Sequence, residues 1–77
     1  MQLKQLMTEH VELIHPDTTV QEAARVMRVA HIGALPVAEG SQLRGILTER
    51  DLVARVLAEG RDPTRPTVRD VMTAELI

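Results

Sequence analysis

The stretch Leu43-Arg-Gly-Ile-Leu-Thr-Glu-Arg-Asp-Leu-Val-Ala-Arg-Val-Leu57 decides the fold, because it begins as a strand and ends as a helix. Residues 43–47 alternate between two faces within a short apolar run, which predicts a strand. The pattern changes at Thr48. Beyond it, apolar residues recur on one face of a helix, at Leu52, Val53, Val56 and Leu57.

Thr48 and Asp51 have the spacing of a capping box, with Asp in place of the usual Glu. Free amide groups at the start of this helix would lie beside a hydroxyl, a carboxylate and Arg50. Such a group of polar atoms predicts a cradle for an anion or a nucleotide. Spacing alone favours the simpler interpretation that the two residues only cap a helix.

The residues before this stretch predict a strand, a helix and a second strand. Val11–Ile14 is typical of a short strand, which His15 and Pro16 end. The helix begins with a full capping box, Thr19 and Glu22, and Gly33 is well placed to end it. Residues 34–38 predict the next strand, with Pro36 at a sheet edge or a bulge.

A turn and a second long helix complete a β-α-β-β-α order, which is an α+β fold. The turn, residues 39–42, forms a hairpin loop of about four residues. The second helix runs from Glu49 to Glu59, and Gly60 is its stop signal.

The two ends of the chain repeat one another. Residues 3–8 and residues 68–73 match position by position, at an offset of 65 residues, and each predicts a short helix. We therefore divide the chain into a first unit, residues 1–60, a proline-containing linker, residues 61–66, and the start of a second unit, residues 67–77. The alternative is chance similarity between two short amphipathic turns.

Length and composition narrow the classes of function. A chain of 77 residues buries about 60% of its unfolded surface, so a partner would add stability. The absence of Phe, Tyr and Trp and the net charge of -2 count against nucleic-acid binding. No apolar run approaches the roughly 20 residues of a membrane span. With no apolar signal region at its start, the chain is predicted to be cytoplasmic.

The sequence does not favour a metal site or an enzyme. There is no cysteine, and His10, His15 and His31 lack the spacing of metal ligands on a helix. Glu49 and Asp51 do not face each other on a helix, so they make a poor acid–base pair. We predict no catalytic and no metal-binding residues.

The order of elements and three motifs resemble the CBS domain, a small regulatory module that normally occurs in tandem pairs called Bateman modules. The motifs are Ala34-Leu-Pro-Val37, Gly45-Ile-Leu-Thr-Glu-Arg-Asp51 and the repeated Met-Thr pair. The resemblance covers nearly the whole chain. It implies a three-stranded sheet covered by two helices, with two units packed sheet to sheet around two clefts.

By this resemblance, the clefts hold adenosine derivatives such as AMP, ADP, ATP or S-adenosylmethionine. Asp51 would accept hydrogen bonds from the ribose hydroxyls, and Thr48 would contact the ribose or the first phosphate. Arg50 would offset phosphate charge. The remaining implied ligand-binding residues are Gly33, Ala34, Leu35 and Pro36 on one wall and Ile14, His15 and Pro16 on the other.

The residue types add two expectations to this site. Ile14, Leu35 and Ile46 could form an apolar slot for an adenine. Gly33 and Ala34 occupy positions where CBS domains that bind several phosphates often have basic side chains. We therefore expect a monophosphate or an uncharged adenosyl ligand.

One CBS unit cannot form the pair alone, so we expect a homodimer or a longer parent chain. The alternative function is a structural dimerisation module that binds no ligand.

Overall fold

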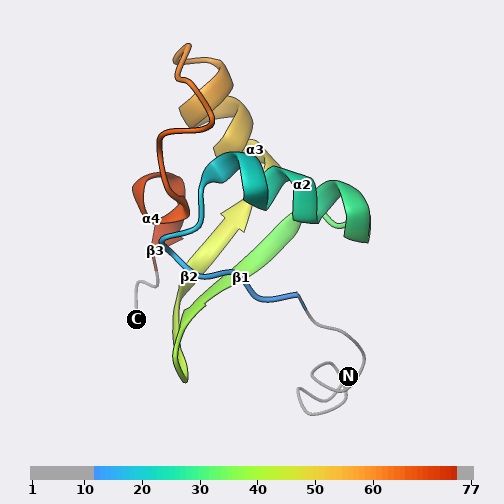
Figure 1. Ribbon diagram of the computed structural model, residues 1–77, viewed down its shortest axis with the longest axis vertical. Helices are drawn as coiled ribbons and strands as arrows, with labels where there is room; N and C mark the ends of the chain where they lie inside the picture. The colour runs from blue at the N-terminus through green and yellow to red at the C-terminus, as the bar shows by residue number, and fades with distance from the viewer. Residues whose placement is uncertain (1–11, 75–77) are drawn as a thin grey trace.

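The computed structural model describes residues 12–74, and it shows an α+β arrangement in which the helix α2 lies across a β-hairpin (Figure 1). The sheet has three antiparallel strands in the order β1-β2-β3, so the predicted fold class is confirmed. The predicted helix at residues 2–7 lies outside the described residues. In chain order the elements are α2 (Val20–Ala30), β1 (Ala34–Glu39), β2 (Gln42–Thr48), α3 (Glu49–Leu52), η1 (Val53–Leu57), α4 (Val68–Val71) and β3 (Thr73–Ala74).

The hairpin of β1 and β2 is tighter than predicted. Glu39 pairs with Gln42, so the loop contains only Gly40 and Ser41, whereas the sequence predicted about four residues. Gly40 has a φ of 63°, a conformation that glycine adopts without strain, and this permits the short turn. The register then shifts by one residue after Val37, as in a β-bulge.

The third strand of the sheet is β3, and it is not the predicted strand at residues 11–14, of which Val11 lies outside the described residues. Of the described residues before α2, only Ile14 pairs with a strand residue, through an isolated parallel bridge to Val37 on β1. The strand that pairs with β2 is β3, in which Thr73 lies opposite Ile46. Pro36 lies on β1, an outer strand of the sheet, as its missing N–H predicted.

The first long helix starts as predicted but ends earlier. The Thr19 hydroxyl accepts a hydrogen bond from the Glu22 amide at 3.2 Å, which is one half of the predicted capping box. The helix ends at Ala30, because His31 takes a left-handed conformation with a φ of 57°. The prediction that Gly33 ends this helix is therefore wrong. Asn and His enter this conformation more readily than branched residues do.

The second long helix changes its hydrogen bonding after one turn. It begins at Glu49 as predicted, but Val53–Leu57 form a π-helix, in which the Ala58 amide bonds to the Val53 carbonyl at 2.8 Å. Gly60, with a φ of 69°, follows the end of the helical segment, as its stop signal predicted. A π-turn of this kind is a local widening of a helix that sequence periodicity does not reveal.

The core lies between the inner face of the hairpin, α2, η1 and α4. Val68 and Val71, from the segment predicted to begin a second unit, are fully buried in this core. Residues 68–74 therefore complete the first unit, and whether they also begin a second one stays a prediction. The buried residues that form this core cluster are Ile14, Val20, Ala23, Met27, Leu35, Val37, Leu47, Val56, Val68 and Val71.

Candidate functional site

The junction between β2 and α3 contains the predicted capping box. The Asp51 amide donates to the Thr48 hydroxyl at 3.1 Å, and the Thr48 amide donates to Asp51 Oδ2 at 2.9 Å. Thr48 has extended backbone angles, as a residue at the edge of a helix should. Two amide groups that would otherwise lack partners are thus satisfied by one pair of residues.

Asp51 is the one charged residue that is buried among residues 12–74, with 7% of its surface exposed. Its second oxygen, Oδ1, lies 3.4 Å from the hydroxyl of Thr73 on β3. A buried carboxylate is costly unless hydrogen bonds replace its lost water. Here one donor contacts each oxygen, and each oxygen keeps a lone pair for a further donor.

Gly33 and Ala34 lie beside this junction, as the resemblance implied. Ala34 pairs with Thr48 across the hairpin, and the Glu49 amide donates to the Gly33 carbonyl at 2.9 Å. A side chain at position 33 would collide with the Glu49 carboxylate, so the space beside Gly33 is already filled. The structure brings Gly33, Ala34, Thr48, Arg50 and Asp51 to one end of the hairpin.

The backbone amides at this helix start do not form the open cradle that the sequence predicted. Those of Thr48 and Asp51 bond to each other's side chains, and that of Glu49 bonds to Gly33. Little backbone N–H capacity is left for a phosphate. Arg50 is exposed at the first turn of α3, and it is the basic residue nearest to Asp51 in the sequence.

The other predicted wall lies at a different part of the hairpin. Ile14 bonds to β1 on both sides of Val37, donating to the Pro36 carbonyl at 3.1 Å and accepting from the Ala38 amide at 2.9 Å. Val37 is three residues along the strand from Ala34, roughly 10 Å at the usual rise. Within this unit, Ile14, His15 and Pro16 are therefore separated from Asp51.

The predicted apolar slot does not form. Leu35 is completely buried and Ile14 is 6% exposed, and both belong to the core. Ile46 is 42% exposed, on the opposite face of the sheet. Successive residues of a strand point to opposite faces, and because Leu35 pairs with Leu47, Ile46 must face away from it.

The outer face of the sheet carries a shallow hollow of about 330 Å³. Thr73 both lines this hollow and contacts Asp51, so it connects the hollow with the buried carboxylate. The sequence singled out Thr73 only as part of the repeated Met-Thr pair and did not place it at this site. The lining residues are Pro36, Leu43, Gly45, Ile46, Thr73 and Ala74.

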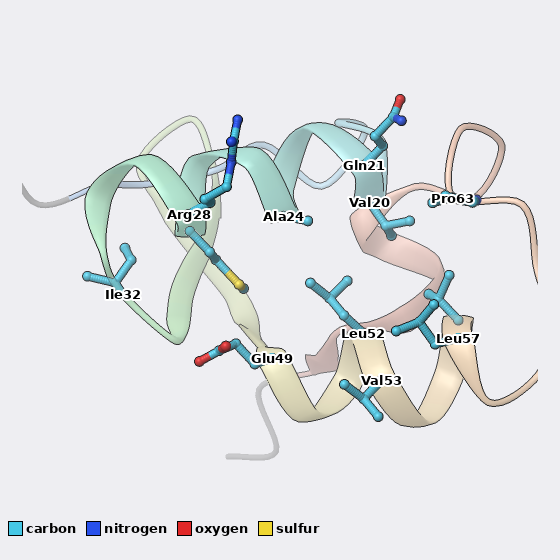
Figure 2. A pocket seen from close by; sticks show the side chains of 12 residues that line it. Val20, Gln21, Ala24, Arg28, Ile32, Glu49, Leu52, Val53, Leu57 and Pro63 are labelled. Atoms are coloured by element: carbon cyan, nitrogen blue, oxygen red, sulfur yellow. The ribbon is translucent and has the colours of Figure 1, made fainter.

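A second, larger groove of about 490 Å³ lies between α2 and the α3–η1 helix (Figure 2). Its lining is mostly apolar, and Arg28 and Glu49 supply opposite charges at one end of it (Figure 2). Leu57 and Val53 on its η1 side are 71% and 55% exposed. The sequence predicted that these residues share one apolar face of a helix, and in this unit both side chains remain open to solvent.

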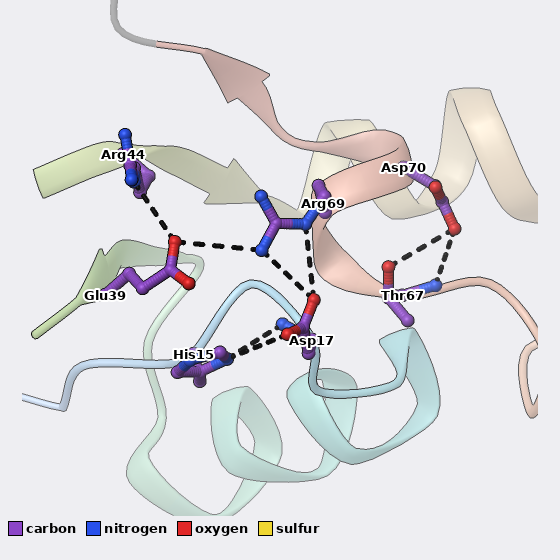
Figure 3. Close-up of polar contacts among 7 residues, drawn as sticks. All are labelled: His15, Asp17, Glu39, Arg44, Thr67, Arg69 and Asp70. Atoms are coloured by element: carbon purple, nitrogen blue, oxygen red, sulfur yellow. Dashed lines mark hydrogen bonds and ion pairs between the residues drawn. The ribbon is translucent and has the colours of Figure 1, made fainter.

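Charged side chains attach the C-terminal segment to the N-terminal turn (Figure 3). Arg69 of α4 donates to the Asp17 carboxylate through two nitrogens, at 3.1 and 3.2 Å, and lies 3.7 Å from Glu39. Glu39 also accepts from Arg44 at 3.2 Å. Arg44 is thus engaged near the start of β2, at the hairpin turn, whereas Thr48 ends that strand.

Two further findings concern function classes. Within residues 12–74, no three side chains of His, Asp or Glu come together in a way that could hold a metal ion. Over the same residues, every helix is too short or too polar to cross a lipid bilayer.

Comparison with known proteins identifies relatives over almost the full chain. A sequence profile of the CBS domain family matches residues 3–58. The CBS domain-containing protein YhcV of Bacillus subtilis is 44% identical over 75 residues, which are 97% of this chain and 53% of YhcV. Hypoxic response protein 1 of Mycobacterium tuberculosis is 36% identical over 69 residues, 88% of this chain and 48% of that protein. The chain thus spans about half the length of these curated relatives.

Solved structures agree with these matches. A cystathionine beta-synthase domain protein fused to a Zn-ribbon-like domain has a TM-score of 0.82 and 30% identity, over 86% of this chain and 94% of that one. Both the sequence profile and the structural similarity cover more than half of the chain. The chain belongs to the CBS domain family.

Proposed function

We propose that this chain is a regulatory module that binds an adenosyl ligand between two paired CBS units. CBS domain proteins are regulatory modules whose units commonly pair. The ligand would lie against the outer face of the sheet, with its ribose at Asp51 and its base toward Ile46. The partner unit, a second copy or a neighbouring unit of a longer chain, would cover the other side.

The burial of Asp51 carries this proposal. Thr67 and Asp70 form a similar cap, in which the Thr67 amide donates to the Asp70 carboxylate at 2.9 Å, the same distance as between Thr48 and Asp51. Asp70 is nevertheless exposed, whereas Asp51 is 7% exposed. Capping a helix therefore does not require burial. A buried carboxylate beside an open hollow is suited to accept both hydroxyls of a cis-diol.

The surroundings of Asp51 favour a ligand with little negative charge. Glu49 adds a second carboxylate near Gly33, and the amides of Thr48, Glu49 and Asp51 already have partners. Arg50 is the basic side chain closest in sequence, and it could offset one phosphate. AMP or an uncharged adenosyl group fits this balance better than ATP.

Pairing through the outer sheet face is supported by its apolar exposure. Leu43 and Ile46 are 55% and 42% exposed on this face. Their burial against a second unit would remove apolar surface from water at about 25 cal/mol per Å². Structurally similar CBS proteins include one described as the hexameric CBS-CP12 protein from bloom-forming cyanobacteria, with a TM-score of 0.75 and 31% identity.

A calorimetric titration with AMP tests the ligand proposal. Asp51→Asn keeps an oxygen to accept from the Thr48 amide but replaces one acceptor by an NH₂ donor, so AMP affinity should fall at least about tenfold. Asp70→Asn makes the same change in the exposed cap of α4 and should leave AMP affinity unchanged. Equal affinity in the wild type and Asp51→Asn would refute the ribose assignment.

The second candidate is a structural dimerisation module without a ligand. It is favoured by the backbone amides at the start of α3, which already donate hydrogen bonds within the protein. A thermal-shift series with adenosine, AMP, ADP, ATP and S-adenosylmethionine separates the two. A ligand present at 100 times its dissociation constant stabilises the folded protein by about 2.7 kcal/mol. No shift with any of them at millimolar concentration would favour the structural module.

A further inference from the structure

We propose that Thr73 is a positioning residue that holds the Asp51 carboxylate in the orientation needed to read a ribose diol. This inference rests on the proposed function and adds a residue from the C-terminal segment to the site. Thr73 lines the outer hollow, and its hydroxyl lies 3.4 Å from Asp51 Oδ1. It is therefore placed to act on both the carboxylate and the space in front of it.

Three separate contacts bring Thr73 to this position. β3 pairs with β2, which sets Thr73 opposite Ile46. Gly45 allows the strands to come close, because a side chain there would collide with the Thr73 carbonyl. Arg55 reaches from η1 to the carbonyls of Val71 and Met72, at 3.0 and 3.2 Å, and so anchors the residues just before Thr73.

The hydrogen-bond capacity of the carboxylate explains why such a residue matters. A carboxylate has about four acceptor positions, two on each oxygen. The Thr48 amide takes one position on Oδ2, and the Thr73 hydroxyl takes one on Oδ1. One position remains on each oxygen, which matches the two hydroxyl donors of a cis-diol.

The contact is long for a hydroxyl bonded to a carboxylate, for which about 2.7 Å is usual. Hydrogen bonds in a binding site are often long before the ligand arrives and shorten in the complex. Without Thr73, the Thr48 amide would hold only Oδ2 of Asp51, and Oδ1 would be free to change its position. Thr73 restrains that second oxygen, so its loss should weaken ligands that use both oxygens more than ligands that use one.

A purely structural role for Thr73 makes a different prediction. If its hydroxyl only fastened β3 to the sheet, removing it would lower the affinity for every ligand of the hollow by a similar factor. The ratio of affinities for AMP and 2′-deoxy-AMP is therefore the informative quantity. The two probes differ only in the 2′-hydroxyl, one of the two donors of the diol.

The test is calorimetric titration of both probes into the wild type, Thr73→Val, Thr73→Ala and Thr73→Ser. The wild type should prefer AMP, and the two variants without a hydroxyl should lose about fivefold in AMP affinity but less than about twofold for 2′-deoxy-AMP. Thr73→Ser keeps the hydroxyl and should retain the preference. Thr64→Val is the matched control, since it removes a hydroxyl that donates to Asp62 at 2.7 Å in an exposed loop.

Each contrary result has a distinct meaning. Equal losses for AMP and 2′-deoxy-AMP in Thr73→Val and Thr73→Ala would overturn the role of Thr73 and leave the proposed function intact. Loss of the preference in Thr73→Ser as well would also overturn that role. A wild type that binds neither probe would overturn this inference, and one that also binds neither adenosine nor S-adenosylmethionine would overturn the proposed function with it.

Discussion

At the scale of single residues, Thr48 and Asp51 serve the helix and the candidate site at once. Their spacing was enough to predict the capping box, because caps depend on residues three apart in the sequence. The burial of Asp51 and its contact with Thr73 were not predictable in this way. They depend on a contact across 22 residues, which local pattern does not encode.

Thr48→Ala should lower the free energy of unfolding by about 1 kcal/mol, because the Asp51 amide loses its acceptor. Thr48→Ser keeps the hydroxyl and should lie close to the wild type. Urea unfolding followed by circular dichroism measures both. An unchanged free energy in Thr48→Ala would mean that the cap contributes nothing to stability.

Asp62 gives a prediction about pH. The Thr64 amide, followed by the Thr64 hydroxyl, lowers the pKa of Asp62 below its ordinary value. A lowered pKa in the folded state adds stability above the unfolded pKa, and this is lost as pH falls through the folded pKa. Thr64→Val should raise the pKa of Asp62 only part of the way, because the backbone bond remains. NMR titration of the Asp62 side-chain carbon measures this, and an unchanged pKa would contradict it.

At the scale of elements, the sequence predicted α2, the hairpin of β1 and β2, and the start of the second long helix, but it did not predict β3. Alternation and turn residues located β1 and β2, and helical spacing located α2 and α3. The sequence did not predict β3 as a strand, because the pairing between β2 and β3 joins segments that are far apart in the chain. The two-residue loop and the bulge after Val37 then decided which side chains face outward, and this removed Leu35 from the predicted slot.

Gly45→Ala tests how closely β3 must approach β2. The added methyl group would meet the Thr73 carbonyl and lie 3.1 Å from the Ala74 Cα, so β3 must move. We expect a loss of about 1–3 kcal/mol in the free energy of unfolding, measured by urea titration. Gly40→Asn is the control, since nothing lies within 4 Å of that position and Asn tolerates its positive φ. Equal stability of the Gly45→Ala variant and the wild type would contradict the close approach.

At the scale of the whole molecule, residues 12–74 bury an apolar core and leave two apolar surfaces open. The two are the outer sheet face and the groove between α2 and η1. A sequence pattern identifies the apolar faces of helices and strands. It does not show which of these faces are buried within the unit and which stay exposed. The proposed pairing uses the sheet face, because that face adjoins Asp51 through Thr73.

Ile46→Arg should reduce self-association, because it places a charge at the centre of the proposed pairing surface. Val29→Arg is the matched control, since Val29 is 69% exposed on α2 and lines neither the hollow nor the groove described above. Sedimentation equilibrium over a range of concentrations measures the dissociation constant of each variant. Pairing in Ile46→Arg as tight as in the wild type would exclude this face.

The central claim is that an adenosyl ligand binds where β2 meets α3, with the Asp51 carboxylate on its ribose. Titration of AMP into ¹⁵N-labelled protein, followed by amide chemical shifts, tests this most directly. The account predicts the largest changes at Ala34, at Ile46, at Thr48–Leu52 and at Thr73. Changes confined to the groove between α2 and η1, or no changes at millimolar AMP, would contradict it.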